Sequence, residues 1–383
     1  MGGHVNGQVV DAETGQVLLD RDASRALTPA STVKLLTAAA ALRTLGPTAT
    51  LNTGVVRDGS TLYLIGGGDV TLRAAPTAAS AYPSTADMTS LATQTASALG
   101  ATRTVRLCLD TSAWSPGPTQ APGWNPGYFS GGDIAHLSPL EVDEGAANVR
   151  HPARAPITRV SDPTAAAGVA FAVALRHVGV TVTSTGCRAS APPSALGVAS
   201  VSSPPVSALV QRMLTLSDND LAESLGRAVA RREGQPANFA GEATAVSNEL
   251  HSLGVDVTDL TLYDASGLSH LDRVSPHTLV QVVQLAAGNA HPELRVLLDG
   301  MPIAGLTGTL ATRYRRGPSR AAAGVARAKT GTLAGVNTIT GFVVDADARL
   351  LVFAFMTDRA SGPAAAEAAL DRLVARLATC DCR

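Results

Sequence analysis

Two short motifs of this sequence hold the residue types that an activated serine needs. Ser31 and Lys34 lie three positions apart in "PASTVKLLTAAAAL", at the start of a predicted helix, so both side chains project from one face. A serine hydroxyl becomes a nucleophile when a base removes its proton, and a neutral lysine can be that base. The lysine pKa, about 10.4 in water, must then fall by several units, which burial and a second nearby cation can achieve. Lys329, in the last motif along the chain, "KTGT", can supply that cation.

Between these two lies another motif, Ser217-Asp218-Asn219, the second of three in chain order, which stands directly before an amphipathic helical pattern. Each motif alone has a structural explanation, since Ser, Asp and Asn are common helix N-caps, a Lys-Thr-Gly run can end a strand, and Ser-x-x-Lys recurs on solvated helix faces. However, Lys34 and Lys329 are the only lysines among 30 basic residues, and arginine cannot act as the base because it effectively never deprotonates. The residues that flank Lys34 are almost all apolar, which predicts a buried helix.

The three motifs together resemble a known signature. Ser-x-x-Lys, Ser-Asp-Asn and Lys-Thr-Gly, in this order, mark penicillin-binding proteins and class A β-lactamases. The long segment between the first two motifs resembles the penicillin-binding protein 4 type of D-alanyl-D-alanine carboxypeptidase/endopeptidase, peptidase family S13, in which extra domains are inserted there. Ala265 and Val70 depart from this pattern, which more often has glycine and proline there. Four further segments are similar to blocks of that family: "YLIGGGDVTL", "LSPLEVDEGAANVR", "LYDASGLSHLDRVSP" and "MPIAGLTGTLATRY".

The resemblance implies a role for each side chain of the first two motifs. Ser31 is expected to attack the carbonyl of the penultimate D-alanine of a peptidoglycan stem peptide, giving an acyl-enzyme, while Lys34 takes its proton. Ser217 is expected to relay a proton to the leaving D-alanine, and Asn219 to bond the amide of the substrate. Water then releases the acyl group. Cleavage of peptide cross-links and acylation by β-lactam antibiotics, acting as inhibitors, are expected at the same site.

The Lys-Thr-Gly strand is expected to bind the other end of the substrate. Lys329 would add positive charge that helps to keep Lys34 neutral, and Thr330 would bind the terminal carboxylate of a substrate or a β-lactam. Gly331 belongs to the same substrate-binding run, and the backbone N–H groups of Thr332 and of the nucleophilic serine would form the oxyanion hole. The turn at residues 264–267 is expected near the active site.

The pattern of elements predicts an α/β (α+β) fold in which helices flank an antiparallel sheet, and the resemblance implies that this is the penicillin-binding protein transpeptidase-like fold. Residues 5–20 read as a β-hairpin, residues 325–356 contain three strand-like runs, and residues 363–378 have helical spacing. The two ends are therefore expected to share one sheet. We predict a catalytic domain of residues 1–47 and 201–383, and an inserted region of residues 48–200 that forms two small domains.

Composition limits the partners of the chain. A net charge of -1 gives no reason to expect nucleic acid or an anionic membrane as the main partner. No cysteine or histidine cluster has metal-ligand spacing, so neither a metal nor another cofactor is predicted. Aromatic residues make up 3% of the chain, so the core must be built from small and aliphatic side chains.

The four cysteines and the family resemblance bear on the compartment. Cys108, Cys187, Cys380 and Cys382 permit disulfides; a bridge between the first two, both in the middle region, is one arrangement among those left open. The resemblance implies a location outside the cytoplasm, in the periplasm or on the cell-wall face. The opening residues 1–4 lack the basic-then-apolar pattern of an export signal, so we expect that signal to be missing from this sequence.

Two rival functions stay open on sequence grounds. A serine β-lactamase would share the acylation step but must deacylate quickly, and class A enzymes use a glutamate soon after Ser-Asp-Asn for this purpose. Glu233 and Glu242 follow the motif here, without a Glu-x-x-x-Asn match. A non-catalytic module that senses β-lactams or peptidoglycan would usually have lost a motif residue, and none is lost.

Overall fold

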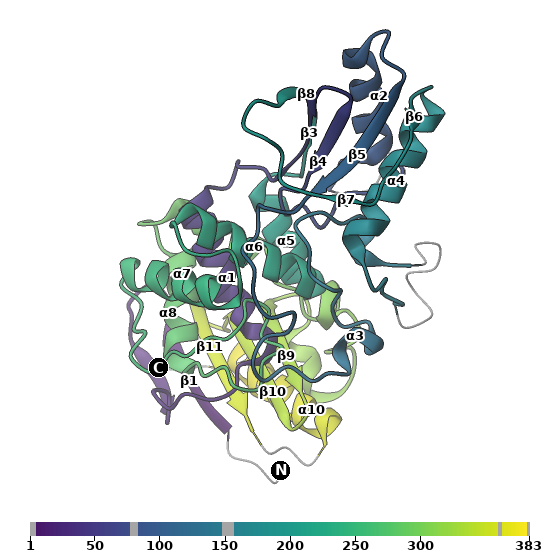
Figure 1. Cartoon of the computed structure of the whole chain (residues 1–383). Helices are drawn as coiled ribbons and strands as arrows, with labels where there is room; N and C mark the ends of the chain where they lie inside the picture. Colours follow the sequence, from purple (N-terminus) through teal and green to yellow (C-terminus); the bar gives the residue numbers. More distant parts are fainter. Residues whose placement is uncertain (1–4, 77–82, 148–156, 359–361, 381–383) are drawn as a thin grey trace.

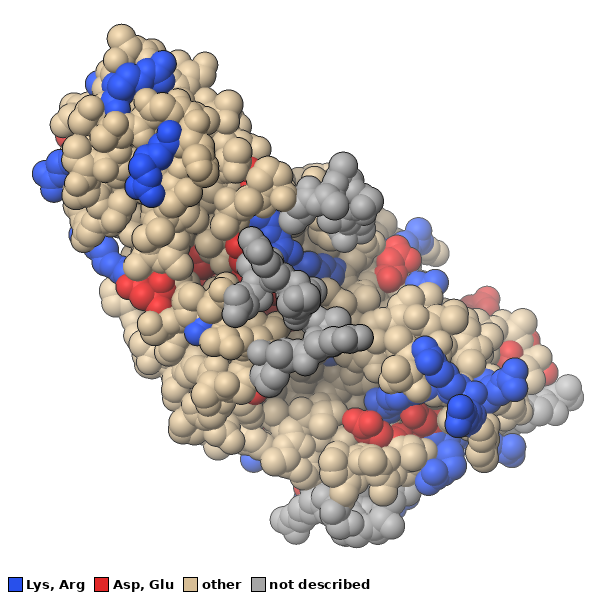
Figure 2. Space-filling view, turned by 90° about the vertical axis from the view of Figure 1, so that its right-hand side faces the viewer, with Lys and Arg blue, Asp and Glu red and all other residues tan. Residues whose placement is uncertain are grey.

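The structure, a computed structural model, describes residues 5–76, 83–147, 157–358 and 362–380. Figure 1 shows a larger lobe, which contains the first and last strands of the chain, and a smaller lobe built from the middle of the chain. Figure 2 shows the smaller lobe projecting from the larger body, with acidic and basic side chains interspersed on that face. Among the described residues, none of the helices combines the length and the apolar character needed to span a membrane.

The larger lobe is built on an antiparallel sheet with strand order β2-β1-β11-β10-β9. The N-terminal strand therefore lies between its hairpin partner and the C-terminal strand, so the ends of the chain share one sheet as predicted. The strands are β1 (Val5–Asp11), β2 (Val17–Arg21), β9 (Ala326–Leu333), β10 (Val336–Val344) and β11 (Leu350–Thr357).

Both faces of this sheet are covered, which explains why β11 is apolar throughout. Val352 and Ala354 of β11 pack into the helical core on one face, while Phe353 and Phe355 pack against the C-terminal helix on the other. Successive side chains of a strand alternate between faces, so a strand buried on both faces loses the apolar-polar alternation. The helices of this lobe are α1 (Val33–Leu45), α5 (Val206–Leu216), α6 (Asn219–Arg232), α7 (Phe239–Ser252), α8 (Pro276–Ala287), α9 (Val296–Gly300) and, on the second face, α10 (Pro363–Ala378). The predicted fold class is confirmed.

The smaller lobe has its own sheet and its own apolar core. The sheet has the order β6-β5-β4-β3-β8, with β7 pairing to β5, and α2 (Met88–Leu99) and α4 (Pro163–His177) contribute side chains to its core. Since β8 ends at Ser202, this sheet runs two residues past the predicted boundary. Its described residues form one core, and the division into two small domains stays a prediction. The strands are β3 (Asn52–Asp58), β4 (Thr61–Ile65), β5 (Thr104–Asp110), β6 (Thr181–Val182), β7 (Cys187–Arg188) and β8 (Leu196–Ser202).

A long segment of the inserted region leaves the smaller lobe and packs on the larger one. Residues 121–135 of this segment, with the short helix α3 (Tyr128–Gly131), are called the inserted loop below. Trp124 of the inserted loop lies in an apolar cluster with Phe239 of α7 and Leu268 of the turn at residues 264–269. The short 3-10 helices of the chain are η1 (Ala30–Thr32), η2 (Asp143–Gly145), η3 (Pro292–Arg295), η4 (Gly308–Leu310) and η5 (Gly317–Ala322).

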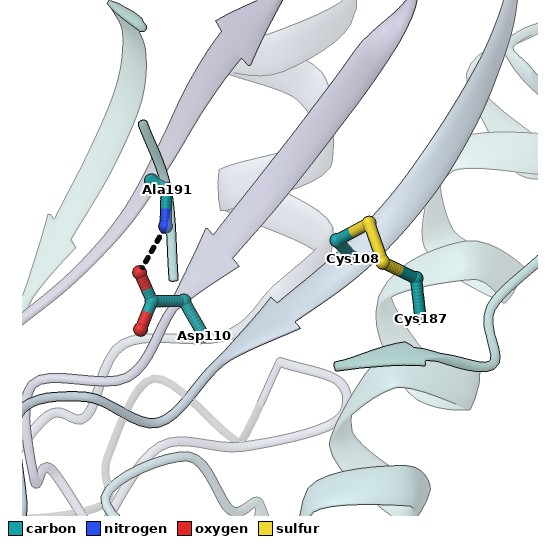
Figure 3. The surroundings of a disulfide bond; sticks show 4 residues. All are labelled: Cys108, Asp110, Cys187 and Ala191. Carbon is teal, nitrogen blue, oxygen red and sulfur yellow. Dashed lines mark hydrogen bonds between the residues drawn. A yellow bond between two sulfur atoms is a disulfide. The ribbon is translucent and has the colours of Figure 1, made fainter. Parts of the chain in front are cut away.

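A disulfide joins two neighbouring strands of the smaller lobe. Cys108 of β5 is bonded to Cys187 of β7, which resolves one pairing that the sequence left open. Figure 3 shows the bridge beside a second tie between the same segments, where Ala191 N donates to Asp110 Oδ2 at 2.7 Å. Cys382 lies outside the described residues, as do residues 1–4 and the last three residues of the family-like segment 137–150.

Loss of this disulfide should destabilise the smaller lobe. The bridge closes a loop with a sequence separation of 79 residues, and removing a crosslink of that length costs about 2–5 kcal/mol of folding free energy. We expect the double substitution Cys108→Ala with Cys187→Ala to lower the urea midpoint under oxidising conditions, and to match the wild type measured under reducing conditions. An unchanged midpoint in the double variant would contradict a stabilising role.

Candidate active site

The first motif sits where a 3-10 turn leads into a buried helix. Ser31 lies in η1, and Lys34 lies in the first turn of α1, whose residues from Val33 to Leu42 are all buried. Ala30, directly before the serine, has a positive φ of 49°, a conformation that costs energy for a residue with a side chain. The surrounding packing therefore holds the serine at a strained entry to the helix.

Lys34 is fully buried, and its amine lies within hydrogen-bond distance of three oxygen atoms. Nζ lies 3.1 Å from Ser31 Oγ, 2.7 Å from Asn219 Oδ1 and 2.6 Å from the backbone carbonyl of Ser266. A neutral amine has two N–H bonds and one lone pair. When Asn219 Oδ1 and the Ser266 carbonyl take the two N–H bonds, the lone pair faces the hydroxyl of Ser31. The geometry suits a base that removes the serine proton.

Ser217-Asp218-Asn219 forms the joint between two helices. Ser217 ends α5 in the left-handed conformation, with φ 59° and ψ 39°. Asp218 is the N-cap of α6, where its side chain accepts the Leu221 N–H at 3.0 Å. Asn219, the first residue of α6, directs Oδ1 to Lys34 and Nδ2 to the Asp133 carbonyl at 2.8 Å. The role of this motif as a helix cap is therefore compatible with its expected catalytic role, because the cap residue Asp218 fixes the positions of Ser217 and Asn219 on either side of it.

The third motif lies on β9, at the edge of the sheet. Lys329 is fully buried, and its Nζ donates to Ser217 Oγ at 2.9 Å and to the Thr330 carbonyl at 2.6 Å. Gly331 is needed for close packing, since a Cβ there would lie 2.7 Å from the Pro29 carbonyl and 2.2 Å from Thr338 Oγ1. The motif thus lies directly against the turn that carries the nucleophilic serine. The side chain of Thr332 is close to α10, with its hydroxyl 3.4 Å from Glu367 Oε1.

The turn at residues 264–269 forms a fourth wall of the site. Its Ser266 carbonyl accepts from Lys34, and Gly267 packs against the serine turn so closely that a Cβ would lie 2.0 Å from the Ala30 carbonyl. The φ of Gly267 is also positive, at +81°, which favours glycine. The structure thus places this turn beside Lys34 and the serine turn, where the resemblance led us to expect it. The departure at Ala265 leaves the contacts intact, because its backbone carbonyl still accepts from Thr37 at 2.7 Å.

Burial controls the charge of both lysines. Burial lowers the pKa of Lys34 to about 8, against an opposing field from buried acids, of which Asp264 and Glu223 contribute most. Burial also holds the pKa of Lys329 well below its usual range, and the positive charge of Lys34 lowers it further. Two ammonium groups in one buried site repel each other, so the site favours a state in which one of the two lysines is neutral.

Two contributors to the site were not predicted from the sequence. Thr309 of η4 places its hydroxyl 2.8 Å from that of Thr330 and so orients it. Glu223 of α6 accepts the N–H groups of Ala265 and Ser266 at 3.2 and 3.0 Å, and so holds the backbone directly before the carbonyl that faces Lys34. Glu223 also pairs with Arg227 four residues on, and this spacing is the same in ordinary exposed helical ion pairs. The sequence alone therefore could not distinguish Glu223 from a residue of an exposed ion pair. Thr309 lies in one of the family-like segments, "MPIAGLTGTLATRY", but the sequence assigned it no role.

All eight predicted site residues meet around the serine turn. A buried lysine against a serine, with a second buried lysine across from it, is the arrangement expected of a serine acyl-transfer enzyme. The chain belongs to the D-Ala-D-Ala carboxypeptidase 3 (S13) family, whose pattern matches residues 1–156 and 151–379. The family suggested by the three motifs is confirmed. The predicted site residues are Ser31, Lys34, Ser217, Asn219, Lys329, Thr330, Gly331 and Thr332.

Individual relatives agree with this assignment. The carboxypeptidase DacB of Mycolicibacterium smegmatis is 41% identical over 99% of this chain and 81% of its own length. Carboxypeptidase Rv3627c of Mycobacterium tuberculosis is 39% identical with the same coverage. The crystal structure of penicillin binding protein 4 from Haemophilus influenzae has the same fold, with a TM-score of 0.83 and 22% identity over 99% of this chain and 97% of that one. That protein is also known in complex with a novel β-lactam.

The lysine base predicts a pH dependence with a definite sign. Protonated Lys34 cannot accept the serine proton, so acylation should be slow below its pKa of about 8 and level off above it. We expect the second-order rate constant for acylation by benzylpenicillin, measured from pH 6 to 10, to rise about tenfold per pH unit on the acid side. A profile that is flat from pH 6 to 8 would contradict a neutral Lys34 as the base.

Proposed function

We propose that this serine DD-peptidase of family S13 removes the terminal D-alanine of peptidoglycan stem peptides through an acyl-enzyme on Ser31. The observation that carries the proposal is the buried amine of Lys34, held between Ser31 Oγ, Asn219 Oδ1 and the Ser266 carbonyl. Cleavage of a cross-link is the same reaction at a D-alanine whose carbonyl is bonded to a side-chain amine of another stem peptide instead of to a terminal D-alanine, so the same residues would serve it.

Acylation would proceed by proton transfer and attack at one carbonyl. Lys34 takes the hydroxyl proton while Ser31 Oγ bonds to the carbonyl carbon of the penultimate D-alanine. The backbone N–H groups of Ser31 and Thr332 would stabilise the negative oxygen, an effect worth about 3 kcal/mol in comparable sites. The carbon–nitrogen bond then breaks, and Ser217 would relay the proton taken up by Lys34 to the departing amine, which leaves Lys34 neutral again. Lys329, bonded to Ser217 Oγ at 2.9 Å, supports that relay.

Substrate binding would use the edge of the sheet and the opposite wall. Thr330, oriented by Thr309, would bond the terminal carboxylate, and the nearby Lys329 would supply favourable charge in its protonated form, which the bound carboxylate itself favours. Asn219 keeps one N–H and one oxygen lone pair after bonding Lys34 and Asp133, which suffices for an amide of the substrate. Water would attack the ester carbon in the second half of the reaction, and the proton that it loses would return to Ser31.

We place the enzyme outside the cytoplasm, where its peptidoglycan substrate lies. The disulfide between Cys108 and Cys187 supports this location, because such bonds persist in oxidising compartments. β-Lactams would bind as analogues of the D-alanyl-D-alanine end and acylate the same serine. The β-lactamase alternative differs in the second step, the release of the acyl group by water, which would have to be fast. Rapid turnover of nitrocefin, in place of a long-lived acyl-enzyme, would favour this alternative.

The nucleophile can be tested by intact-protein mass spectrometry. Wild-type protein exposed to benzylpenicillin should gain the mass of one β-lactam, and Ser31→Ala should gain none, because the acceptor oxygen is gone. Lys34→Arg keeps a positive charge but cannot act as a base, so its acylation should slow by roughly 10²–10⁴-fold. An adduct that persists in Ser31→Ala would place the nucleophile elsewhere, and unchanged acylation of Lys34→Arg would exclude Lys34 as the base.

A further inference from the structure

We propose that Trp124 of the inserted loop is a positioning residue for Lys34, acting through Asp264 and the turn that carries the Ser266 carbonyl. The inference rests on the proposed role of Lys34 as the base. It gives the inserted region a part in catalysis: it would hold the acceptors that orient the base.

The first link is between the inserted loop and Asp264. The indole Nε1 of Trp124 donates to Asp264 Oδ2 at 2.6 Å, and both side chains are buried. The ring packs at 5.2 Å from Phe239, edge to face, so its position is fixed from the catalytic lobe as well. A short hydrogen bond to a buried carboxylate is stronger than one between neutral groups.

The second link is between Asp264 and the turn. Asp264 Oδ1 accepts the Gly267 N–H at 2.6 Å, and Oδ2 accepts the Ser269 N–H at 2.7 Å in addition to the indole. The carboxylate therefore holds the backbone on the C-terminal side of Ser266. Glu223 holds the N-terminal side, through the N–H groups of Ala265 and Ser266. The direction of the Ser266 carbonyl, and so of one N–H bond of Lys34, is set by these contacts.

The inserted loop also supports the other acceptor of Lys34. The Asp133 carbonyl, at the far end of the loop, takes Nδ2 of Asn219 and so fixes which end of that amide faces the lysine. Near Trp124, the Pro122 carbonyl accepts from Ser269 Oγ at 2.7 Å. The inserted loop thus supports both Asn219 Oδ1 and the Ser266 carbonyl. Because these two groups accept the N–H bonds of neutral Lys34, its lone pair is directed at Ser31.

The charge balance around Lys34 gives this role a signature that packing alone lacks. The indole bond favours the charged form of Asp264, and that charge raises the pKa of Lys34. Removing the indole N–H should therefore move the pH inflection of acylation downward while the plateau rate falls. The titratable groups that interact with Lys34 or Asp264 from the packed elements are Asp218, the N-cap of α6, Asp220 and Glu223 of α6, Glu242 of α7, Lys329 of β9, Tyr128 of the inserted loop, and Asp272 beyond the turn.

A double-mutant cycle on the full chain tests the inference. Trp124→Phe, Asp264→Asn and the double variant would be compared by benzylpenicillin acylation across pH 6–10. We expect each single change to lower the plateau rate constant about tenfold and to shift the inflection to lower pH. The double variant should be no slower than Asp264→Asn alone, because the indole acts through that carboxylate.

Two further variants separate positioning from folding. Replacement of Trp124 by β-(3-benzothienyl)alanine keeps the shape of the ring and removes its N–H, so it should reproduce the kinetic changes with little loss in melting temperature. Trp114→Phe shortens the other tryptophan of the chain without removing a bond to Asp264, and its plateau rate should stay within about twofold of the wild type.

The outcomes are distinct. Multiplicative effects in the double variant, or an isosteric variant with wild-type kinetics, would overturn the inference and leave Trp124 with a packing role. If the role of Trp124 is overturned in this way but the wild-type protein is still acylated at Ser31 in the same assay, the proposed function stands. Absence of acylation in the wild type would instead count against the proposed function and, with it, against the role of Trp124.

Discussion

The arrangement of this protein depends on one buried amine. Lys34 projects from a helix with an almost entirely apolar environment, and a polar group in such surroundings is costly unless its hydrogen bonds are made. Its three acceptors come from the serine turn, from the start of α6 and from the turn at residues 264–269, which are far apart in the sequence. Their convergence on Nζ satisfies the lysine and assembles the site at the same time.

The motifs that surround the lysine likewise serve both the fold and the site. Ser217 and Asn219 flank Asp218, a residue that caps a helix, so the joint between α5 and α6 fixes both side chains. Gly331 and Gly267 are required because neighbouring backbone leaves no room for a Cβ, and both lie against the turn that presents Ser31. Residues conspicuous for their chemistry are thus also the residues that let the elements approach one another.

The sequence predicted the parts of the molecule that local patterns encode. The terminal hairpin, the strands of residues 325–356 and the last helix have clear periodicity or turn signals, and the three motifs have distinctive residue types. The path of the inserted loop was not predictable, because Trp124 and Asp264 are 140 positions apart and neither stands in a periodic pattern. Glu223 was equally inaccessible, since its spacing to Arg227 matches an exposed ion pair, and burial alone distinguishes the two.

The place of β1 in the sheet has a consequence for how the chain is made. This strand pairs with β11, so β1 cannot gain its second neighbouring strand until the C-terminal part of the chain has been synthesised. The inserted lobe has its strands and core within residues 52–202, and can form while the rest of the chain is still being synthesised. During synthesis, the apolar helix that carries Lys34 stays without most of its packing partners, which begin at Val206. The active site is therefore assembled late in synthesis. A chain whose synthesis is incomplete should contain a folded inserted lobe and an unassembled active site.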